Sequence, residues 1–207
     1  MKAKGNVWII AGVILILISA MLTGYNLLDS RQAQNASAAA VTVLKDQLPP
    51  TVVATPELTD PACLPEELPD FMRFPDMEMP VVIVEERAYV GMIEIPVLGL
   101  ALPVLDDWNY PALKVAPCRY EGSAYTGDLI VMAHNYDSHF GKLRQLQPED
   151  EVRFTDMAGN VFTYRVMELE TLPGSAVEDM SAGQWDLTLF TCTYGGQSRV
   201  TIRCRQV

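Results

Sequence analysis

Two strand-like runs near the C-terminus constrain the fold more than any other feature of the sequence. Residues 187–192 alternate bulky and β-branched side chains with the period of two that is typical of a strand, and they end on Cys192. Residues 193–197 are rich in turn formers, and their two adjacent glycines permit positive φ. A second β-branched run, residues 198–202, carries Arg199. If the two runs are antiparallel neighbours, the thiol and the guanidinium reach the same cleft.

Similar short runs recur through the second half of the chain, separated by proline, glycine and other turn-forming residues. A hairpin turn is expected at residues 158–160 and a short helix at residues 111–115. Seven or eight short strands with turn signals between them predict a mainly β fold, a closed β-barrel with short helices. The strands that we expect cover residues 88–95, 98–104, 129–133, 151–155, 161–167, 187–192 and 199–203.

The charge and the cysteine content exclude several classes of function. The formal net charge is −11, so the surface offers no basic patch that could neutralise nucleic-acid phosphates. The four cysteines show no CxxC spacing, which argues against a zinc site or a disulfide framework. Cys118 and Cys204 either form a bridge or, as we favour, are small buried apolar residues. The sequence predicts no cofactor.

An apolar run at the N-terminus predicts a membrane anchor. Residues 7–22 are apolar apart from small residues and one serine, and the run continues more weakly to residue 28, which is long enough to span a bilayer as a helix. Two lysines precede the run, and Asp29 and Arg31 follow it, so the N-terminus is expected to be cytoplasmic. The alternative is a cleaved signal peptide, for which the apolar stretch is long.

Two different segments connect the anchor to the expected barrel. Residues 29–48 have helix-like apolar spacing and predict a helix that either packs on the barrel or stands as a stalk. Residues 49–80 hold eight of the 14 prolines, and Arg73 is their only base. This composition indicates an extended linker, which we interpret as a spacer rather than a lid. The expected organisation is a cytoplasmic tip and anchor (1–28), a helical stalk and Pro-rich acidic linker (29–80), and a catalytic barrel (81–207).

Cys192, His134 and Arg199 are the candidate catalytic residues. Only the thiolate form of a cysteine attacks well, so a nucleophilic cysteine needs a base or a cation nearby. His134 ends the apolar run 129–133 and can protonate a leaving amine and later accept a proton. Arg199 keeps its charge in a protein and can stabilise an oxyanion. The alternative interpretation of Cys192 is a buried structural residue.

Neighbouring residues of the same types are expected to have structural roles. His139 is the only other histidine and competes with His134, but we interpret it as a capping or packing residue. Arg203 and Arg205 lie further along the last run and are interpreted as solvated charges on a strand face. No aspartate or asparagine is assigned to orient the candidate histidine, because Asn135 points the opposite way if strand geometry continues.

The C-terminal stretch resembles a known family. Residues 188–192, Thr-Leu-Phe-Thr-Cys, resemble the TLxTC signature of sortases, and Arg199 stands where that family has its arginine. Residues 131–135, Val-Met-Ala-His-Asn, are similar to the family's strand followed by its histidine, and residues 89–96 followed by 102–104 are similar to its opening hairpin. The resemblance covers residues 89–207. Together with an N-terminal anchor, this combination is specific.

The resemblance implies a sortase fold and a membrane-anchored cysteine transpeptidase with its catalytic domain outside the cell. Its substrates would be secreted proteins with a C-terminal sorting motif, and the acceptor would be an amine of a peptidoglycan precursor or a pilin. Cys192 would form the thioacyl intermediate, with His134 as acid and base and Arg199 as the stabilising cation. A cysteine peptidase that only hydrolyses, and a non-catalytic anchored barrel that binds peptides or wall polymer, are the alternatives.

The class within the family is less clearly indicated. Six residues separate Cys192 from Arg199, which resembles class B sortases, as does the helical segment before the barrel. Residues 168–185 are, however, too short for the long helix typical of that class and offer only a turn of helix at residues 176–180. The sequence therefore leaves open the class, the choice between an LPxTG-like and an NPxTx-like motif, wall anchoring or pilus assembly, and calcium dependence.

Overall fold

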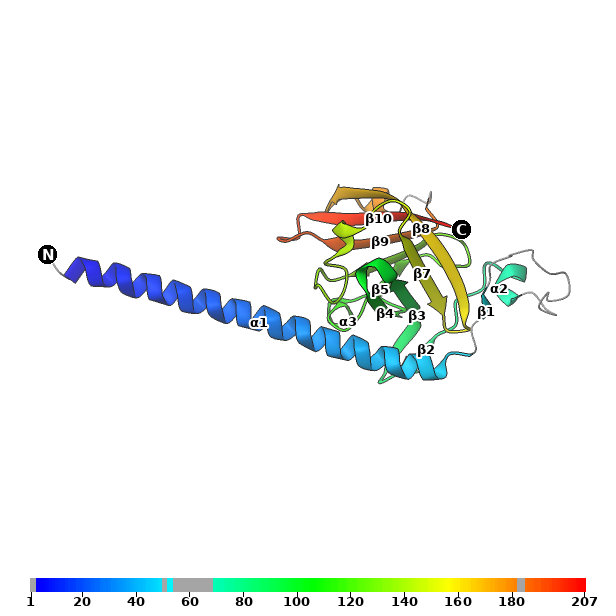
Figure 1. The fold of residues 1–207 in the computed structure, drawn as a ribbon, viewed down its shortest axis with the longest axis horizontal. Helices are drawn as coiled ribbons and strands as arrows, with labels where there is room; N and C mark the ends of the chain where they lie inside the picture. Colours follow the sequence, from blue (N-terminus) through cyan, green and yellow to red (C-terminus); the bar gives the residue numbers. More distant parts are fainter. Residues whose placement is uncertain (1–2, 50–51, 54–68, 182–184) are drawn as a thin grey trace.

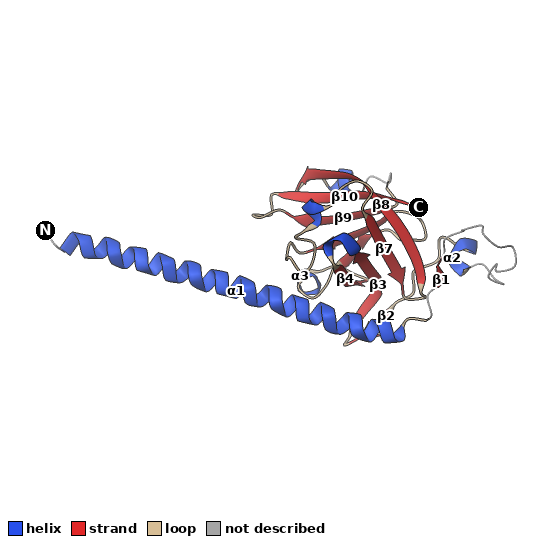
Figure 2. Ribbon diagram, viewed as in Figure 1, coloured by secondary structure: helices blue, strands red, loops and turns tan. Residues whose placement is uncertain are grey.

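One long helix lies beside a β-barrel in the computed structural model of the chain (Figure 1, Figure 2). The structure describes residues 3–49, 52–53, 69–181 and 185–207. The helices are α1 (Ala3–Gln47), α2 (Asp70–Arg73), α3 (Tyr110–Leu113) and α4 (Val177–Met180), and the 3-10 turns are η1 (Pro96–Leu98) and η2 (Leu143–Gln145). The strands are β1 (Val52–Val53), β2 (Val82–Val84), β3 (Arg87–Ile95), β4 (Leu100–Leu105), β5 (Cys118–Glu121), β6 (Leu129–Ala133), β7 (Glu151–Asp156), β8 (Asn160–Pro173), β9 (Leu187–Cys192) and β10 (Ser198–Gln206).

Eight strands close the barrel. Neighbouring strands follow the order β8–β10–β9–β6–β5–β4–β3, and β7 pairs with both β3 and β8, which completes the ring. β1 and β2 pair outside this ring, with β8 and β3. The predicted mainly β fold, a closed barrel of seven to eight strands with short helices, is confirmed.

Alternating burial accounts for the strands of the barrel wall. Successive residues of β7 alternate between partly exposed and buried positions, and β8 begins with the same alternation. Large inward side chains fill the core, because a closed ring of eight strands leaves just enough room for them. The fully buried ones include Ile93, Leu129, Phe154, Phe162, Tyr164, Leu187 and Leu189.

Several strands differ from what the sequence predicts: β1, β2 and β5 are not in the expected set, and β8 and β10 are longer than expected. β5 is absent from the expected set, since its sequence Cys-Arg-Tyr-Glu is short and polar and is held partly by Arg119, whose Nη2 lies 2.6 Å from Asp106 Oδ1. β8 runs to Pro173 instead of ending at residue 167, because its second half pairs with the first half of β10. Its register runs from Ser198 opposite Pro173 to Arg203 opposite Glu168.

Helix α1 packs on the barrel in its second half. The side chains of Ala33, Ser37, Ala40 and Leu44 are buried, at the spacing of one helix face. Leu44 is 0 % exposed and packs with residues of β3 and β4. Of the two alternatives for residues 29–48, the structure therefore shows the packed helix.

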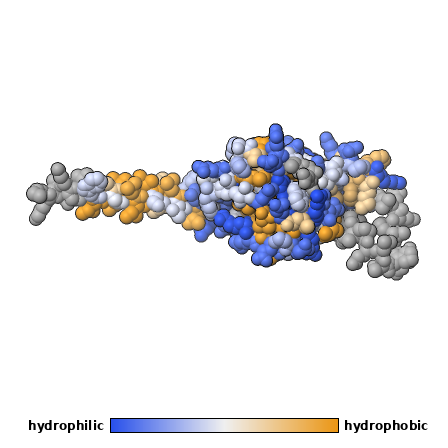
Figure 3. Space-filling model, turned by 90° about the horizontal axis from the view of Figure 1, so that it is seen from above, coloured by the Kyte–Doolittle hydropathy of each residue, from blue (hydrophilic) through white to orange (hydrophobic). Residues whose placement is uncertain are grey.

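The first half of α1 projects away from the barrel (Figure 1). The helix is long and apolar enough to cross a membrane, and none of its apolar window is buried. Figure 3 shows apolar residues along the projecting rod and mainly polar residues over the barrel. Its exposed apolar side chains include Trp8, Ile9, Ile10, Val13, Ile14, Leu15, Ile16, Leu17, Ile18, Met21 and Leu22. Among the described side chains, the apolar residues of the expected anchor from Trp8 to Leu22 that are named above are thus not covered by the barrel.

The described part of the Pro-rich segment lies far from the turn between β9 and β10 (Figure 1). Phe71 of α2 is buried and stacks on Tyr125, with ring centroids 4.8 Å apart. It also contacts Phe162 of β8. Residues 54–68 of the linker lie outside the described residues, so the choice of a spacer over a lid stays a prediction, as do the domain boundaries.

Candidate active site

Two of the three predicted residues, Cys192 and Arg199, lie on the adjacent strands β9 and β10, and His134 directly follows the last residue of β6, the neighbour of β9. In the parallel pair β6–β9, Ala133 lies opposite Thr191, so that His134 and Cys192 follow side by side. In the antiparallel pair β9–β10, Arg199 lies directly opposite Cys192. Neighbouring strands are about 4.8 Å apart, and residues in matching positions have side chains on the same face. The structure therefore brings all three predicted residues together.

The site lies on the outer face of the barrel wall. Leu187 and Leu189 of β9 belong to the core, so the alternate residues Thr188, Phe190 and Cys192 face outwards. Along this face, Phe190 packs with Met180 of α4 in a small apolar cluster. Cys192 continues the row beyond that cluster and is partly exposed.

The two threonines of the Thr-Leu-Phe-Thr-Cys stretch hold β9 to its neighbours. Thr191 Oγ1 donates a hydrogen bond to the carbonyl oxygen of Ala133 at 2.8 Å, immediately before His134. Thr188 Oγ1 accepts a hydrogen bond from Arg203 Nη1 at 3.0 Å. Both hydroxyl groups are buried. The first bond thus fixes the histidine strand against the cysteine strand at the level of the site.

Replacing Thr191 with valine is expected to loosen this alignment. The two side chains have the same shape, so the main loss is the buried hydrogen bond, which is worth about 1 kcal/mol of unfolding free energy. Denaturant unfolding measures this loss, and steady-state kinetics should show a lower kcat because His134 is less firmly aligned. The control is Thr193→Val, which alters a partly exposed turn residue. A Thr191→Val protein as stable and as active as the wild type would contradict this role.

Cys192 differs from the other described cysteines in its exposure. Cys118 and Cys204 are free thiols, so the bridge between them that the sequence allowed is not present, and both are fully buried. Burial raises the pKa of each of these two thiols to about 12. They are the small buried apolar residues that the sequence favoured. Cys192 is partly exposed, and Cys63 lies outside the described residues.

His134 is half-buried between charged groups. Burial lowers the pKa of its imidazole, because the cationic form loses solvation. The carboxylate of Asp29 acts in the opposite direction, and the ammonium of Lys114 lowers the pKa further. The ring of Tyr136 lies beside the imidazole, with centroids 5.0 Å apart. The proton affinity of His134 therefore depends on residues of α1 and of the α3 turn.

His139 is buried and cannot meet a substrate. Its side chain is 0 % exposed, and its Nε2 lies 3.2 Å from Ser37 Oγ on α1. Ser37 donates its one hydroxyl proton to the carbonyl oxygen of Val115, at 2.6 Å, so that His139 Nε2 must be the donor in their hydrogen bond. Burial and the nearby His134 lower the pKa of His139 to about 4. This geometry fits the packing role expected for it.

Arg199 holds the turn that follows the cysteine. Its Nη1 donates to the carbonyl oxygens of Gly196, at 2.9 Å, and Ser198, at 3.2 Å. Gly195 and Gly196 have φ of +88° and +73°, as expected for the paired glycines of this turn. In the described part of the chain no carboxylate pairs with Arg199. Its charge is therefore not neutralised by an ion pair there.

The interpretation of Arg203 as a solvated charge is wrong. The residue is 3 % exposed, and its Nε lies 2.7 Å from Glu170 Oε1. The remaining nitrogens donate to Thr188 Oγ1 and to the backbone carbonyl oxygens of Asp179 and Met180. The outer face of β10 is covered at this point by α4, which strand parity alone does not reveal. Arg205 is exposed and pairs with Asp186, in agreement with its interpretation.

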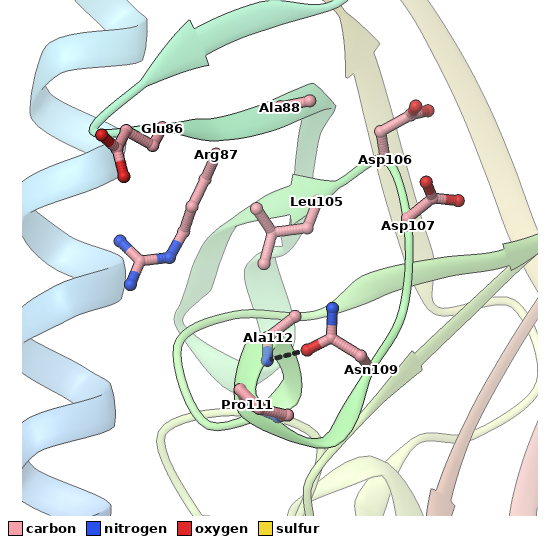
Figure 4. A pocket seen from close by; sticks show the side chains of 9 residues that line it. All are labelled: Glu86, Arg87, Ala88, Leu105, Asp106, Asp107, Asn109, Pro111 and Ala112. Atoms are coloured by element: carbon pink, nitrogen blue, oxygen red, sulfur yellow. Dashed lines mark hydrogen bonds between the residues drawn. The ribbon is translucent and has the colours of Figure 1, made fainter.

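A separate pocket is lined partly by residues of α3 and by the segments before β3 and after β4 (Figure 4). Its volume is about 310 Å³, and it contains none of the three predicted catalytic residues. Its lining residues are Glu86, Arg87, Ala88, Leu105, Asp106, Asp107, Asn109, Pro111 and Ala112. Within the described ranges, no cluster of three or more His, Cys, Asp or Glu side chains could hold a metal ion. The predictions about cofactors and calcium are not tested by this geometry.

Sequence reasoning missed the groups that surround the histidine. Tyr136 donates a hydrogen bond to Asp29 Oδ2, and Lys114 Nζ lies 3.6 Å from Asp29 Oδ1. Asp29 and Tyr136 are 107 residues apart in the sequence. No local pattern links them. The only signal in the sequence was the helical spacing of residues 29–48, which indicated a face able to pack.

Comparison with known proteins identifies the fold and the family. A family model described as a sortase domain matches residues 93–207. Sortase A of Listeria monocytogenes is 20 % identical over 57 % of this chain and 87 % of its own, with a TM-score of 0.53. A sortase D5 transpeptidase of Clostridium perfringens is 18 % identical over 57 % of this chain and 79 % of its own, with a TM-score of 0.51.

Sortase C from Clostridium perfringens SM101 aligns over a larger share of this chain, 70 %, and over 79 % of its own, at 20 % identity and a TM-score of 0.50. A search of curated protein sequences finds no match. The sequence identities to these three structures are low, so the structures support the fold alone. They are sortases A, C and D, and the class B-like features of the sequence stay a prediction.

Proposed function

Because the chain belongs to the sortase family, we propose that it is a cysteine transpeptidase anchored in the cell membrane by α1. The observation that carries this proposal is the register of β6, β9 and β10, in which His134, Cys192 and Arg199 occupy adjacent positions on one face. A thiol, an imidazole and a guanidinium are the nucleophile, the acid–base group and the oxyanion stabiliser that acyl transfer needs.

In the first half of the reaction, the thiolate of Cys192 attacks a backbone carbonyl carbon in the sorting motif. The carbonyl oxygen becomes an oxyanion, whose charge Arg199 stabilises across the strand pair. As the tetrahedral intermediate collapses, the carbon–nitrogen bond breaks and the imidazolium of His134 gives its proton to the leaving amine. The products are a thioester on Cys192, a neutral His134 and a free amine.

In the second half, the amine of an acceptor attacks the thioester carbon. The neutral His134 accepts a proton from the attacking nitrogen, the carbon–sulfur bond breaks, and the thiolate of Cys192 leaves. A new amide bond has formed, and both side chains are back in their starting protonation states. Partial exposure of both residues is consistent with access for two substrates in turn.

The course of α1 supports an anchored enzyme whose catalytic end faces the bilayer. The apolar run ends next to Asp29, and Asp29 contacts Tyr136, two residues after His134. The projecting half of α1 leaves the barrel from the same end as the turn between β9 and β10 (Figure 1). Membership of the sortase family, rather than the course of α1, is the basis on which we propose the substrates and the acceptor: secreted proteins with a C-terminal sorting motif, and an amine of a peptidoglycan precursor or a pilin.

Replacing Arg199 with lysine is expected to lower kcat/KM about 100-fold, because lysine keeps the charge but loses the planar fork of donors. Steady-state kinetics with a cleavable motif peptide would measure the loss. The matched control is Arg144→Lys, which makes the same change at an exposed arginine of η2. The guanidinium of Arg144 lies over the ring of Tyr194, a residue of the turn between β9 and β10. Near wild-type kinetics in Arg199→Lys would remove this residue from the mechanism.

Product analysis separates transfer from hydrolysis. The full chain in detergent is incubated with candidate motif peptides, with and without a small amine, and the products are identified by mass spectrometry. Amide products that grow with the amine concentration support a transpeptidase. Free acids as the only products, at every amine concentration, would contradict transfer and support the cysteine peptidase. No product from any peptide would favour the non-catalytic barrel.

A further inference from the structure

The contact face of α1 begins with a carboxylate. Asp29 is followed on the same face by Ala33, Ser37, Ala40 and Leu44, the spacing of consecutive helical turns. Small side chains at the middle positions allow the helix to approach the barrel closely. Asp29 is the first residue of this face after the exposed apolar run, and its side chain is only 23 % exposed. The helix therefore places the carboxylate of Asp29 in contact with the catalytic end of the barrel.

Each oxygen of this carboxylate has its own partner on the barrel. Oδ2 accepts a hydrogen bond from the hydroxyl group of Tyr136, and Oδ1 lies 3.6 Å from Lys114 Nζ. Tyr136 belongs to the loop after β6, and Lys114 to the turn after α3. One aspartate thus ties two separate segments of the barrel to the membrane-proximal part of α1.

Tyr136 connects this contact to the candidate acid. Its ring centroid lies 5.0 Å from that of His134, at an interplanar angle of 38°, and 5.6 Å from that of His139. The hydroxyl bond to Asp29 restricts where the tyrosine ring can lie, and the ring in turn restricts the imidazole. The negative charge of Asp29 also opposes the effect of burial, because it favours the imidazolium form of His134.

We propose that Asp29 of helix α1 is the positioning residue for His134. It takes the role of orienting the imidazole ring, for which the sequence offered no candidate. It holds Tyr136 against the imidazole ring and supplies the negative charge that stabilises the protonated acid. This inference rests on the proposed function, in which His134 donates a proton to the leaving amine. It makes the membrane anchor part of the catalytic apparatus: an enzyme whose α1 is displaced from the barrel loses its charge partner.

Titratable and charged groups face His134 from several elements, and the test must separate their effects. Asp29 faces it from α1, and Lys114 from the turn after α3, while Tyr136 and His139 belong to its own loop. Cys192 and Arg199 occupy the adjacent strand positions on β9 and β10. Of these, Asp29 and Lys114 are the pair with opposite charges that can be neutralised without touching the reacting groups.

The experiment is an NMR titration of the histidine rings in the full chain, held in detergent micelles, over roughly pH 4 to 9. The chain has only two histidines, and the buried His139 serves as an internal reference. Asp29→Asn removes a negative charge and should lower the pKa of His134 by about 0.5 to 1 pH unit. Lys114→Gln removes a positive charge and should raise it. Asp29→Glu keeps the charge and should restore most of the wild-type value.

The decisive result is a His134 pKa that moves down in Asp29→Asn and up in Lys114→Gln. Both substitutions break the same contact between α1 and the barrel, so a merely structural role would move the His134 titration in the same direction in both proteins. Ser37→Ala removes a different contact of α1, with no change of charge, and should leave the titration of His134 where it is. An unchanged pKa in Asp29→Asn, or a shift of the same sign in Lys114→Gln, would overturn the proposal.

Kinetics provide a second, separable readout. Asp29→Asn should lower kcat about three- to tenfold at neutral pH, in proportion to the lost imidazolium, with little change in KM. The His134 limb of the pH profile should move to lower pH. A wild-type protein that forms no thioester would refute the proposed function but would still leave the titration shifts to be measured. A wild-type protein that does form one, with no effect of Asp29→Asn, would refute the role of Asp29 alone.

Discussion

Replacing Cys192 with alanine is expected to abolish peptide cleavage completely while changing the free energy of unfolding by less than about 1 kcal/mol. Among the cysteines that the structure describes, Cys192 is the only one that is partly exposed, because Cys118 and Cys204 are buried. The loss of one partly exposed sulfur atom removes little packing, in contrast to truncation in a core. Cleavage of a motif peptide and denaturant unfolding of the same preparation measure the two effects.

Cys204→Ala is the matched control, because the same change is made at a fully buried position. It should lower the unfolding free energy by about 1 to 2 kcal/mol and leave cleavage largely intact. The opposite outcome for Cys192→Ala, a large loss of stability with residual cleavage, would mean that Cys192 is a packing residue.

The largest effect on stability is expected for Arg203→Met, at about 3 kcal/mol or more. The arginine is almost fully buried and donates to a carboxylate, a hydroxyl group and two backbone carbonyl groups. Methionine fills a similar volume but leaves these acceptors without their donor, and an unpaired buried polar group costs more than the bond itself is worth. Denaturant unfolding of the full chain in detergent gives the difference.

Arg205→Met is the control for this substitution. Arg205 is on the same strand, but it is exposed and its ion pair with Asp186 is worth less than about 1 kcal/mol. Equal losses for the two variants would contradict the structural role of Arg203. Because Arg203 also binds Thr188 of β9, its loss should lower the activity as well, through the strand that carries Cys192.

The sequence predicts the strands that carry the site because their local pattern is strong. β6 and β9 have the predicted bounds, 129–133 and 187–192, since each is a run of apolar or β-branched residues bounded by turn formers. Their ends carry His134 and Cys192, so knowing the strands and their pairing is enough to bring the candidate residues together. β5 escaped prediction, since four residues with two charges show no alternation.

The features that sequence reasoning missed depend on contacts between distant segments. Arg203 has the parity of an outward residue, but α4 and Glu170 cover it, and nothing near Arg203 in the chain signals that cover. The position of Asp29 against Tyr136 requires the whole course of α1 along the barrel. Tertiary packing decides both cases, which explains why the orienting group of His134 had no candidate at the level of the sequence.

The central claim is that Cys192 forms a thioacyl intermediate, and intact-mass spectrometry tests it most directly. The full chain in detergent is mixed with a panel of short peptides that carry candidate sorting motifs, and the mass of the protein is followed with and without a small amine. The account predicts an adduct of the acyl fragment on Cys192 that disappears when amine is added, with an amide product in its place. An adduct on another residue, or none with any peptide in a protein whose Cys192 also resists alkylation, would contradict it.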